Sequence, residues 1–126
     1  MTAGRRARVP GAIVVADDEP ALRLLCRINL EAEGYRVLEA ADGAELERVL
    51  AEADVAVLLL DIALGADDGI EIARRLRAER PELPIAFFTG TALPLAEDTE
   101  ELAGAVLPKP FSPELLSATV RGLARS

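Results

Sequence analysis

Five residues with chemically useful side chains lie at the end of a short apolar run of the sequence or within two residues after it. They are Asp17, Asp18, Asp61, Thr89 and Lys109. Short apolar runs of this kind indicate buried strands. In a parallel α/β sheet the carboxyl ends of the strands face one crevice, which is where such folds bind ligands. Three carboxylates, a hydroxyl and an ammonium in one crevice suit a divalent cation and a phosphoryl group.

The elements that would position these residues alternate along the chain. Strands are predicted at five apolar runs, which are 11–16, 35–40, 55–60, 85–89 and 105–107. Helices are predicted in the amphipathic stretches, from Pro20 to a stop at Gly34, around 46–50, at 69–79, at 95–102 and from Ser112 to Leu123. Residues 61–69, rich in glycine and aspartate, are predicted to form a loop. Apolar strands without alternation are typical of a parallel sheet that is covered on both faces.

Composition limits the class of protein. The chain has 126 residues, enough for one domain, and 51% of them are hydrophobic, which allows a sizeable core. Only 3% are aromatic, so the core must be largely aliphatic. The formal net charge of −8 argues against nucleic acid as a direct partner, because phosphate backbones favour basic surfaces. The absence of histidine excludes histidine-based catalysis, histidine-ligated metal and a phosphohistidine within this chain.

The first ten residues are basic but lack the apolar segment of a signal peptide. No apolar run approaches the roughly 20 residues needed to span a bilayer. We therefore expect a cytoplasmic protein with no membrane partner, a disordered tail at 1–10 and one domain at 11–125. Cys26 is the single cysteine, which excludes an internal disulfide, and we interpret it as a small core residue because free cysteine is commonly buried.

Taken together, the strand-end residues resemble the receiver domain of two-component response regulators. The acidic pair, Asp61 with Gly69 eight residues later, Thr89, and Lys109 before Pro110 and Phe111 follow the order and spacing of that family. The resemblance covers residues 12–123. It implies an α/β, flavodoxin-like doubly wound fold, with a five-stranded parallel sheet in the order 2-1-3-4-5. Five helices would cover the sheet, the fourth of them short or irregular.

The same resemblance implies a role for each acidic residue. Asp61 matches the phospho-acceptor, whose carboxylate takes the phosphoryl group as an aspartyl phosphate. Asp18 and Asp61 match the residues that give carboxylate oxygens to Mg²⁺, and Asp17 acts mainly through bound water. The backbone carbonyl of Ala63 is expected to add a further oxygen. Mg²⁺ would offset the negative charge that develops during transfer.

Lys109 and Thr89 match the two residues that respond to the phosphoryl group. The ammonium of Lys109 is expected to pair with the acids before reaction and with phosphoryl oxygens after it. The hydroxyl of Thr89 is expected to turn towards the added charge, remodelling the surface beyond it. The family often has a cis peptide bond at the position of Lys109-Pro110. Phe111 is interpreted as a core side chain beneath this loop.

Several positions depart from the family pattern. Gly65 replaces the usual proline four residues after the acceptor, which predicts a more mobile loop. Ala63 offers no side chain to position an attacking water. Val106 replaces the aromatic residue that is usually coupled to the threonine, and Pro94 lies where the fourth helix would begin.

These departures resemble the FATGUY subgroup of alphaproteobacterial receivers, which also lacks that aromatic residue. The stretch 84–90 matches the subgroup's motif imperfectly. Membership would make 89–102 the mobile segment that contacts partners.

The leading hypothesis is a single-domain response regulator, phosphorylated on Asp61 by a histidine kinase or a phosphotransfer protein. It would be a phospho-acceptor that assists its own phosphorylation and dephosphorylation, not an enzyme acting on other substrates. Its output would be altered contact with an unknown downstream protein, or it would serve as a phosphate sink or shuttle. It is expected to be a monomer or a weak homodimer.

Two alternatives come from other classes. One is a receiver-like module that binds a protein constitutively, with little phosphorylation-dependent switching. The other is a phosphatase of the haloacid-dehalogenase type, which also uses an aspartate after a strand. That type has an Asp-x-Asp motif, and Ala63 takes the place of the second aspartate here.

Overall fold

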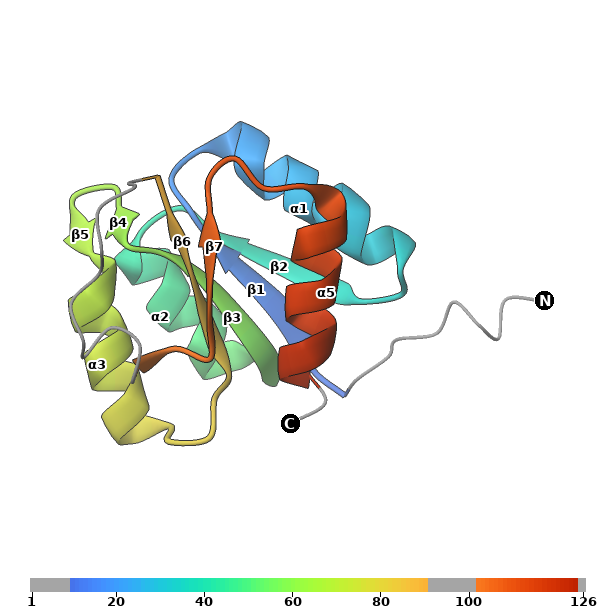
Figure 1. The fold of residues 1–126 in the computed structure, drawn as a ribbon. Helices are drawn as coiled ribbons and strands as arrows, with labels where there is room; N and C mark the ends of the chain where they lie inside the picture. The colour runs from blue at the N-terminus through green and yellow to red at the C-terminus, as the bar shows by residue number, and fades with distance from the viewer. Residues whose placement is uncertain (1–9, 91–101, 125–126) are drawn as a thin grey trace.

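The computed structural model describes residues 10–90 and 102–124, in which five parallel strands form one sheet between two layers of helices (Figure 1). The strands are β1 (Ala12–Ala16), β2 (Arg36–Ala40), β3 (Val55–Asp61), β6 (Ile85–Thr89) and β7 (Ala105–Pro108). The helices within these ranges are α1 (Pro20–Ala32), α2 (Gly43–Glu52), α3 (Gly69–Glu79) and α5 (Pro113–Ala124). The sheet order is β2-β1-β3-β6-β7, which confirms the predicted flavodoxin-like fold and its 2-1-3-4-5 order.

Two hydrophobic clusters lie on opposite faces of this sheet, because successive strand side chains point to opposite sides. Leu58 and Phe87 belong to the cluster covered by α2 and α3, and Leu59 and Phe88 belong to the cluster covered by α1 and α5. All four side chains are fully buried. These two central strands are therefore apolar up to their last residues, Asp61 and Thr89, as a sheet covered on both faces requires.

Cys26 lies in the second cluster with no exposed surface, which confirms its interpretation as a core residue. Burial, reinforced by the negative charge of Asp17, raises the pKa of the Cys26 thiol to about 12. At neutral pH the thiol is therefore protonated and unreactive.

The segment predicted as a loop after β3 contains a short antiparallel hairpin, which was not predicted from the sequence. Its strands are β4 (Ala63–Leu64) and β5 (Asp67–Asp68). Gly65 begins the turn between them with a φ of +62°, in the left-handed region that favours glycine. The hairpin is anchored through both of its strands, since Leu64 is fully buried and the Asp67 carboxylate accepts a hydrogen bond from the backbone N–H of Gly43 at 2.9 Å.

Three predictions fall wholly or largely on residues outside the described ranges. They concern the tail at 1–10, the helix at 95–102 and the position of Pro94. Leu102, which is described, is 8% exposed and packs in the cluster beneath α2 and α3. Among the described residues, no helix combines the length and apolar character needed to cross a bilayer.

Replacing Asp68 by alanine should lower the free energy of unfolding by about 1 kcal/mol, since Asp68 caps α3. Its Oδ1 accepts hydrogen bonds from the backbone N–H groups of Ile70 at 2.9 Å and Glu71 at 3.4 Å. Urea unfolding of the variant measures the loss. The control is Glu79→Ala, an exposed acid at the other end of the same helix, which should change the free energy far less. Equal losses in both variants would contradict a capping role.

Candidate functional site

Asp61 is the last residue of β3, the central strand of the sheet, and its side chain projects at the carboxyl end. The residue is only 7% exposed. Its Oδ1 accepts a hydrogen bond from the backbone N–H of Ala63 at 3.0 Å. Its Oδ2 accepts one from the Lys109 ammonium, also at 3.0 Å. The carboxylate is thus held in a defined orientation at the crevice predicted from the sequence.

The acidic pair lies in the turn between β1 and α1, directly beside this carboxylate. Asp17 is fully buried, and Asp18 is exposed. The backbone N–H of Asp17 donates to Ala40 at 3.0 Å, and its Oδ1 accepts from the backbone N–H of Glu19 at 2.9 Å. The turn is therefore fixed to the end of β2 before it enters the helix.

Two arginines of α1 support the same turn. The Arg23 guanidinium donates to the backbone carbonyl of Asp17 at 2.6 Å and to the Glu39 carboxylate at 2.9 Å. Arg27 donates to the other oxygen of Glu39 at 2.7 Å. Burial alone would raise the pKa of Glu39, but the hydrogen bonds from Arg27 and Arg23 outweigh it and lower that pKa. The position of the acidic pair thus depends on a charged network reaching to β2.

The carboxylates of Asp17, Asp18 and Asp61 form a group whose geometry fits a divalent cation. One oxygen from each lies within 4.8 Å of the others. Asp17 Oδ2 is fully buried and pairs with the Lys109 ammonium at 2.8 Å. A carboxylate oxygen can accept more than one contact, so this buried oxygen can also accept one from a cation or its bound water. An all-oxygen donor set is the one Mg²⁺ prefers.

The pKa of Asp17 is raised above its ordinary value. Burial is the main cause, because it disfavours the charged form, and the negative charge of Asp61 adds to it. The hydrogen bonds and charge of Lys109 and the backbone N–H of Glu19 lower the pKa but only partly offset burial. A cation bound at these carboxylates would stabilise the ionised form.

Lys109 contacts three acids at once. Its Nζ lies 2.8 Å from Asp17 Oδ2, 3.0 Å from Asp61 Oδ2 and 3.0 Å from Glu19 Oε1. Burial by itself would lower the pKa of Lys109, but these carboxylates raise it well above its ordinary value. The backbone N–H of Lys109 donates to Thr89 at 2.7 Å, which ties the lysine loop to the end of β6.

The conformation around Lys109 agrees with two sequence predictions. The Lys109–Pro110 peptide bond is cis. Phe111 stacks on Phe88 with ring centroids 5.3 Å apart and an interplanar angle of 9°. The Lys109 Nζ lies 6.0 Å from the centroid of the Phe88 ring. Phe111 is partly buried and packs against the cluster beneath α1 and α5, in agreement with the predicted packing of its side chain inward from this loop.

Thr89 ends β6, the strand next to β3, and is 6% exposed. In the register of the two strands Asp61 lies opposite Phe88, so Thr89 stands one residue further along the same edge. Its proposed role as a switch stays a prediction. Val106 on β7 is 36% exposed, so a valine lies at the surface where the family usually has an aromatic residue.

The structure brings Asp17, Asp18, Asp61 and Lys109 together and places Thr89 at the adjoining strand end. Sequence reasoning missed Glu19 as a partner of Lys109. The position of Glu19 directly after the acidic pair could have indicated a site residue. An acid just before a helix is equally explained by its favourable interaction with the helix dipole. The roles predicted for the individual residues, including the backbone carbonyl of Ala63 as a ligand, stay predictions.

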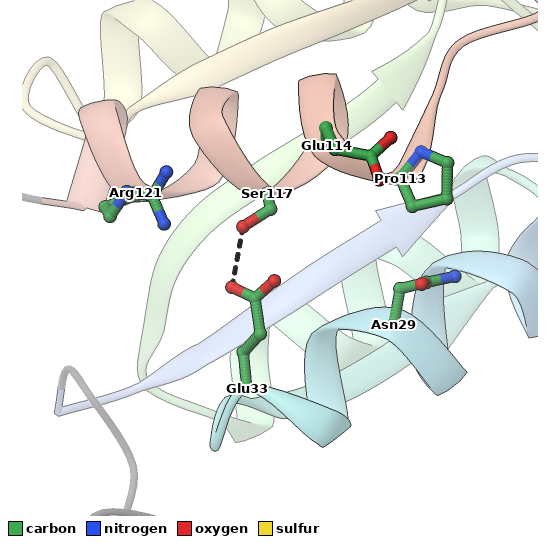
Figure 2. A pocket seen from close by; sticks show the side chains of 6 residues that line it. All are labelled: Asn29, Glu33, Pro113, Glu114, Ser117 and Arg121. Atoms are coloured by element: carbon green, nitrogen blue, oxygen red, sulfur yellow. Dashed lines mark hydrogen bonds between the residues drawn. The ribbon is translucent and has the colours of Figure 1, made fainter.

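A separate hollow of about 320 Å³ lies between α1 and α5 (Figure 2). It is lined by Asn29, Glu33, Pro113, Glu114, Ser117 and Arg121. The Ser117 hydroxyl donates to the Glu33 carboxylate at 2.7 Å across it, which joins the two helices (Figure 2). None of the predicted site residues lines this hollow, so we do not assign the chemistry to it.

Comparisons with known proteins agree with this geometry. A family profile described as the response regulator receiver domain matches residues 13–121. The chain is similar to the aerobic respiration control protein ArcA of Escherichia coli strain K12, with 35% identity over 113 residues, which are 88% of this chain and 47% of ArcA. It is 36% identical to the transcriptional regulatory protein SrrA of Staphylococcus aureus over 115 residues, covering 90% and 47% of the two chains. The chain spans about half the length of these curated relatives.

Solved structures show the same fold. The receiver domain of NtrX from Brucella abortus has a TM-score of 0.85 and 24% identity, covering 90% of this chain and 98% of that one. The response regulator TrrA from Thermotoga maritima, solved in complex with Mg²⁺-BeF, has a TM-score of 0.81 and 27% identity, covering 89% and 97%. The described elements therefore match the architecture of these proteins over nearly the whole chain.

Proposed function

Since this chain belongs to the receiver domain family of response regulators, we propose that Asp61 accepts a phosphoryl group from the phosphohistidine of a histidine kinase or a phosphotransfer protein. One observation carries the proposal. The Asp61 carboxylate is held at the end of the central strand between the Lys109 ammonium and the two other acids of a cation-sized cluster. A carboxylate nucleophile with a cation site and an ammonium beside it is equipped for phosphoryl transfer.

In the transfer, the N–P bond of the donor breaks as a carboxylate oxygen of Asp61 forms an O–P bond, and the imidazole leaves with the electron pair. Asp17, Asp18 and Asp61 would hold Mg²⁺, with the Ala63 carbonyl as a further ligand. When bound, Mg²⁺ offsets the negative charge that collects on the transferring oxygens. Lys109 donates hydrogen bonds to the same oxygens. Its raised pKa keeps the ammonium charged throughout.

The response would start at Thr89, whose hydroxyl we propose donates a hydrogen bond to the new phosphoryl group. That group adds about 1.5 to 2 negative charges and three strong acceptors next to β6. A shift of Thr89 passes to the residues that follow it in the chain and to Lys109, whose backbone N–H it accepts. The output is then a changed protein-binding surface.

The proposal also covers the compartment, the oligomeric state and the partners of the receiver. We propose that the receiver works in the cytoplasm, where kinases draw on ATP, as a monomer or weak homodimer and without contacting nucleic acid itself. Action as a single-domain regulator, or as a phosphate sink or shuttle, stays a prediction, and so does membership of the FATGUY subgroup. The net charge of −8 supports a protein partner over nucleic acid.

Incubation with acetyl phosphate tests the acceptor role directly. Intact mass spectrometry should show one phosphoryl adduct when Mg²⁺ is present and none when it is chelated. Reduction of the acyl phosphate followed by peptide mapping should place the modification on the peptide that contains Asp61. A folded chain that takes up no phosphoryl group with Mg²⁺ present, either from acetyl phosphate or from a phosphohistidine donor, would overturn the proposal.

The second candidate function is constitutive protein binding, and Val106 favours it. A valine with 36% exposure cannot act as the rotating aromatic residue that usually couples the threonine to the surface. Phosphorylation that leaves the affinity for an isolated binding partner unchanged would support this alternative. A change in that affinity would support switching instead.

A further inference from the structure

Glu19 supplies a carboxylate to the phosphoryl site that the family resemblance did not predict. It precedes the first residue of α1, and its Oε1 accepts a hydrogen bond from the Lys109 ammonium at 3.0 Å. Its side chain is 62% exposed, whereas those of Lys109 and Asp61 are 17% and 10% exposed. Glu19 therefore lies on the solvent side of the acid cluster, together with the exposed Asp18.

The hydrogen-bond donors of the Lys109 ammonium are already occupied by carboxylates, one of which is that of Glu19. An ammonium has three N–H donors, and three carboxylates already lie within 3.0 Å of this one. A phosphoryl group needs hydrogen bonds for its own oxygens, so it must displace one of those carboxylates. Asp17 is buried and Asp61 is the nucleophile. Glu19 is therefore the carboxylate that can leave Lys109 and be hydrated by solvent instead. Once displaced, its charge stays at the entrance and repels an anionic donor.

We propose that Glu19 is a specificity-determining residue that disfavours small, doubly charged phosphodonors at this site. The inference rests on the proposed function of Asp61 as phospho-acceptor. With an acyl phosphate, the O–P bond of the donor breaks, Asp61 forms the new O–P bond and the carboxylate of the donor leaves. The repulsion acts on approach, and it grows with the negative charge of the donor.

The test compares two donors of different charge. Acetyl phosphate is a dianion at neutral pH, and phosphoramidate carries a smaller negative charge. Phosphorylation rates are measured by intact mass at low ionic strength, with Mg²⁺ titrated to saturation for each variant. Glu19→Gln should speed the reaction with acetyl phosphate about fivefold and that with phosphoramidate about twofold, as removal of one like charge at short range requires. Both gains should shrink as salt screens the charge.

Two further variants separate charge from structure. Glu19→Asp keeps the negative charge, so its phosphorylation rates with both donors should stay close to those of the unmodified chain. Glu31→Gln is the matched control, because Glu31 is an exposed glutamate of α1 whose partner is Arg27, away from the acid cluster. It should change neither rate. If Glu19 had only a structural role, its replacement would change the phosphorylation rates with both donors by the same factor.

The outcomes keep the two proposals distinct. Equal rate changes for the two donors, or no change in Glu19→Gln, would overturn the role of Glu19 while the acceptor role of Asp61 stands. Absence of any adduct from either donor, in the unmodified chain and in Glu19→Gln alike, would overturn both.

Discussion

Replacing Asp61 by asparagine will abolish phosphoryl uptake from acetyl phosphate and leave the chain folded. An amide oxygen is a poor nucleophile and forms no acyl phosphate, so the adduct should be absent from intact mass spectra. Asparagine has nearly the same volume, and its oxygen can still accept the hydrogen bond from the backbone N–H of Ala63. The cluster loses one negative charge, which reduces repulsion with Asp17, so circular dichroism and thermal unfolding should report an intact fold.

The matched control is Asp54→Asn, the same change just before the first residue of β3. Asp54 is exposed and lies at the opposite end of the strand from Asp61. It should take up the phosphoryl group at the rate of the unmodified chain. Persistence of the adduct in Asp61→Asn, with the control unchanged, would place the acceptor on a different residue.

Replacing Gly69 by alanine will lower the free energy of unfolding by roughly 3 kcal/mol, the upper range for overpacking a rigid site. Gly69 begins α3 and donates its backbone N–H to the carbonyl of Ile62 at 2.7 Å. A Cβ there would overlap the backbone carbonyl oxygen of Asp61 and lie 2.8 Å from that of Ile62. Neither carbonyl can swing aside as a side chain would, so either α3 or the end of β3 must move.

Urea unfolding compares this variant with Gly122→Ala, which adds the same methyl group to a glycine of α5. Apart from its chain neighbours and the backbone of its own helix turn, a Cβ at Gly122 would have no atom within 4 Å. Alanine is favoured over glycine inside a helix, so this control should gain about 0.5 to 1 kcal/mol. A loss below about 0.5 kcal/mol in Gly69→Ala, the range of ordinary surface changes, would contradict a backbone clash. A slower phosphorylation of the folded variant would show that the end of β3 is displaced.

Most of the fold was predictable because its strands are buried on both faces. Val57 to Leu60 are all fully buried, so the run contains no polar residue and stands out in the sequence. The positions of Asp61 and Thr89 follow from where such runs end. Their convergence follows from the parallel pairing of β3 with β6.

The hairpin after β3 was not predictable for a related reason. Its two strands have two residues each, too few for an alternating pattern. Only Leu64 is buried, and a single buried leucine is compatible with any loop. The tertiary hydrogen bond from Gly43 to Asp67, across 24 positions of sequence, holds the hairpin in place. No local pattern records a contact of that kind.

Glu19 escaped prediction because its contact depends on the path of two loops. It lies 90 residues from Lys109 in the sequence and reaches it only because the turn after β1 and the loop after β7 meet at the same edge. The sequence indicated that Glu19 and Lys109 are charged residues near strand ends, but it did not indicate that the two side chains contact each other.

The ring of carboxylates around Lys109 has a consequence for covalent labelling. Lys109 is the only lysine of the 126-residue chain, so acylating reagents meet a single side-chain amine. Only the neutral amine attacks such reagents, and the surrounding acids raise the pKa of Lys109 and so deplete that form. Disruption of the acid cluster restores an ordinary amine. Amine acylation, unselective on most proteins, thus becomes on this chain a chemical reporter of an intact phosphoryl site.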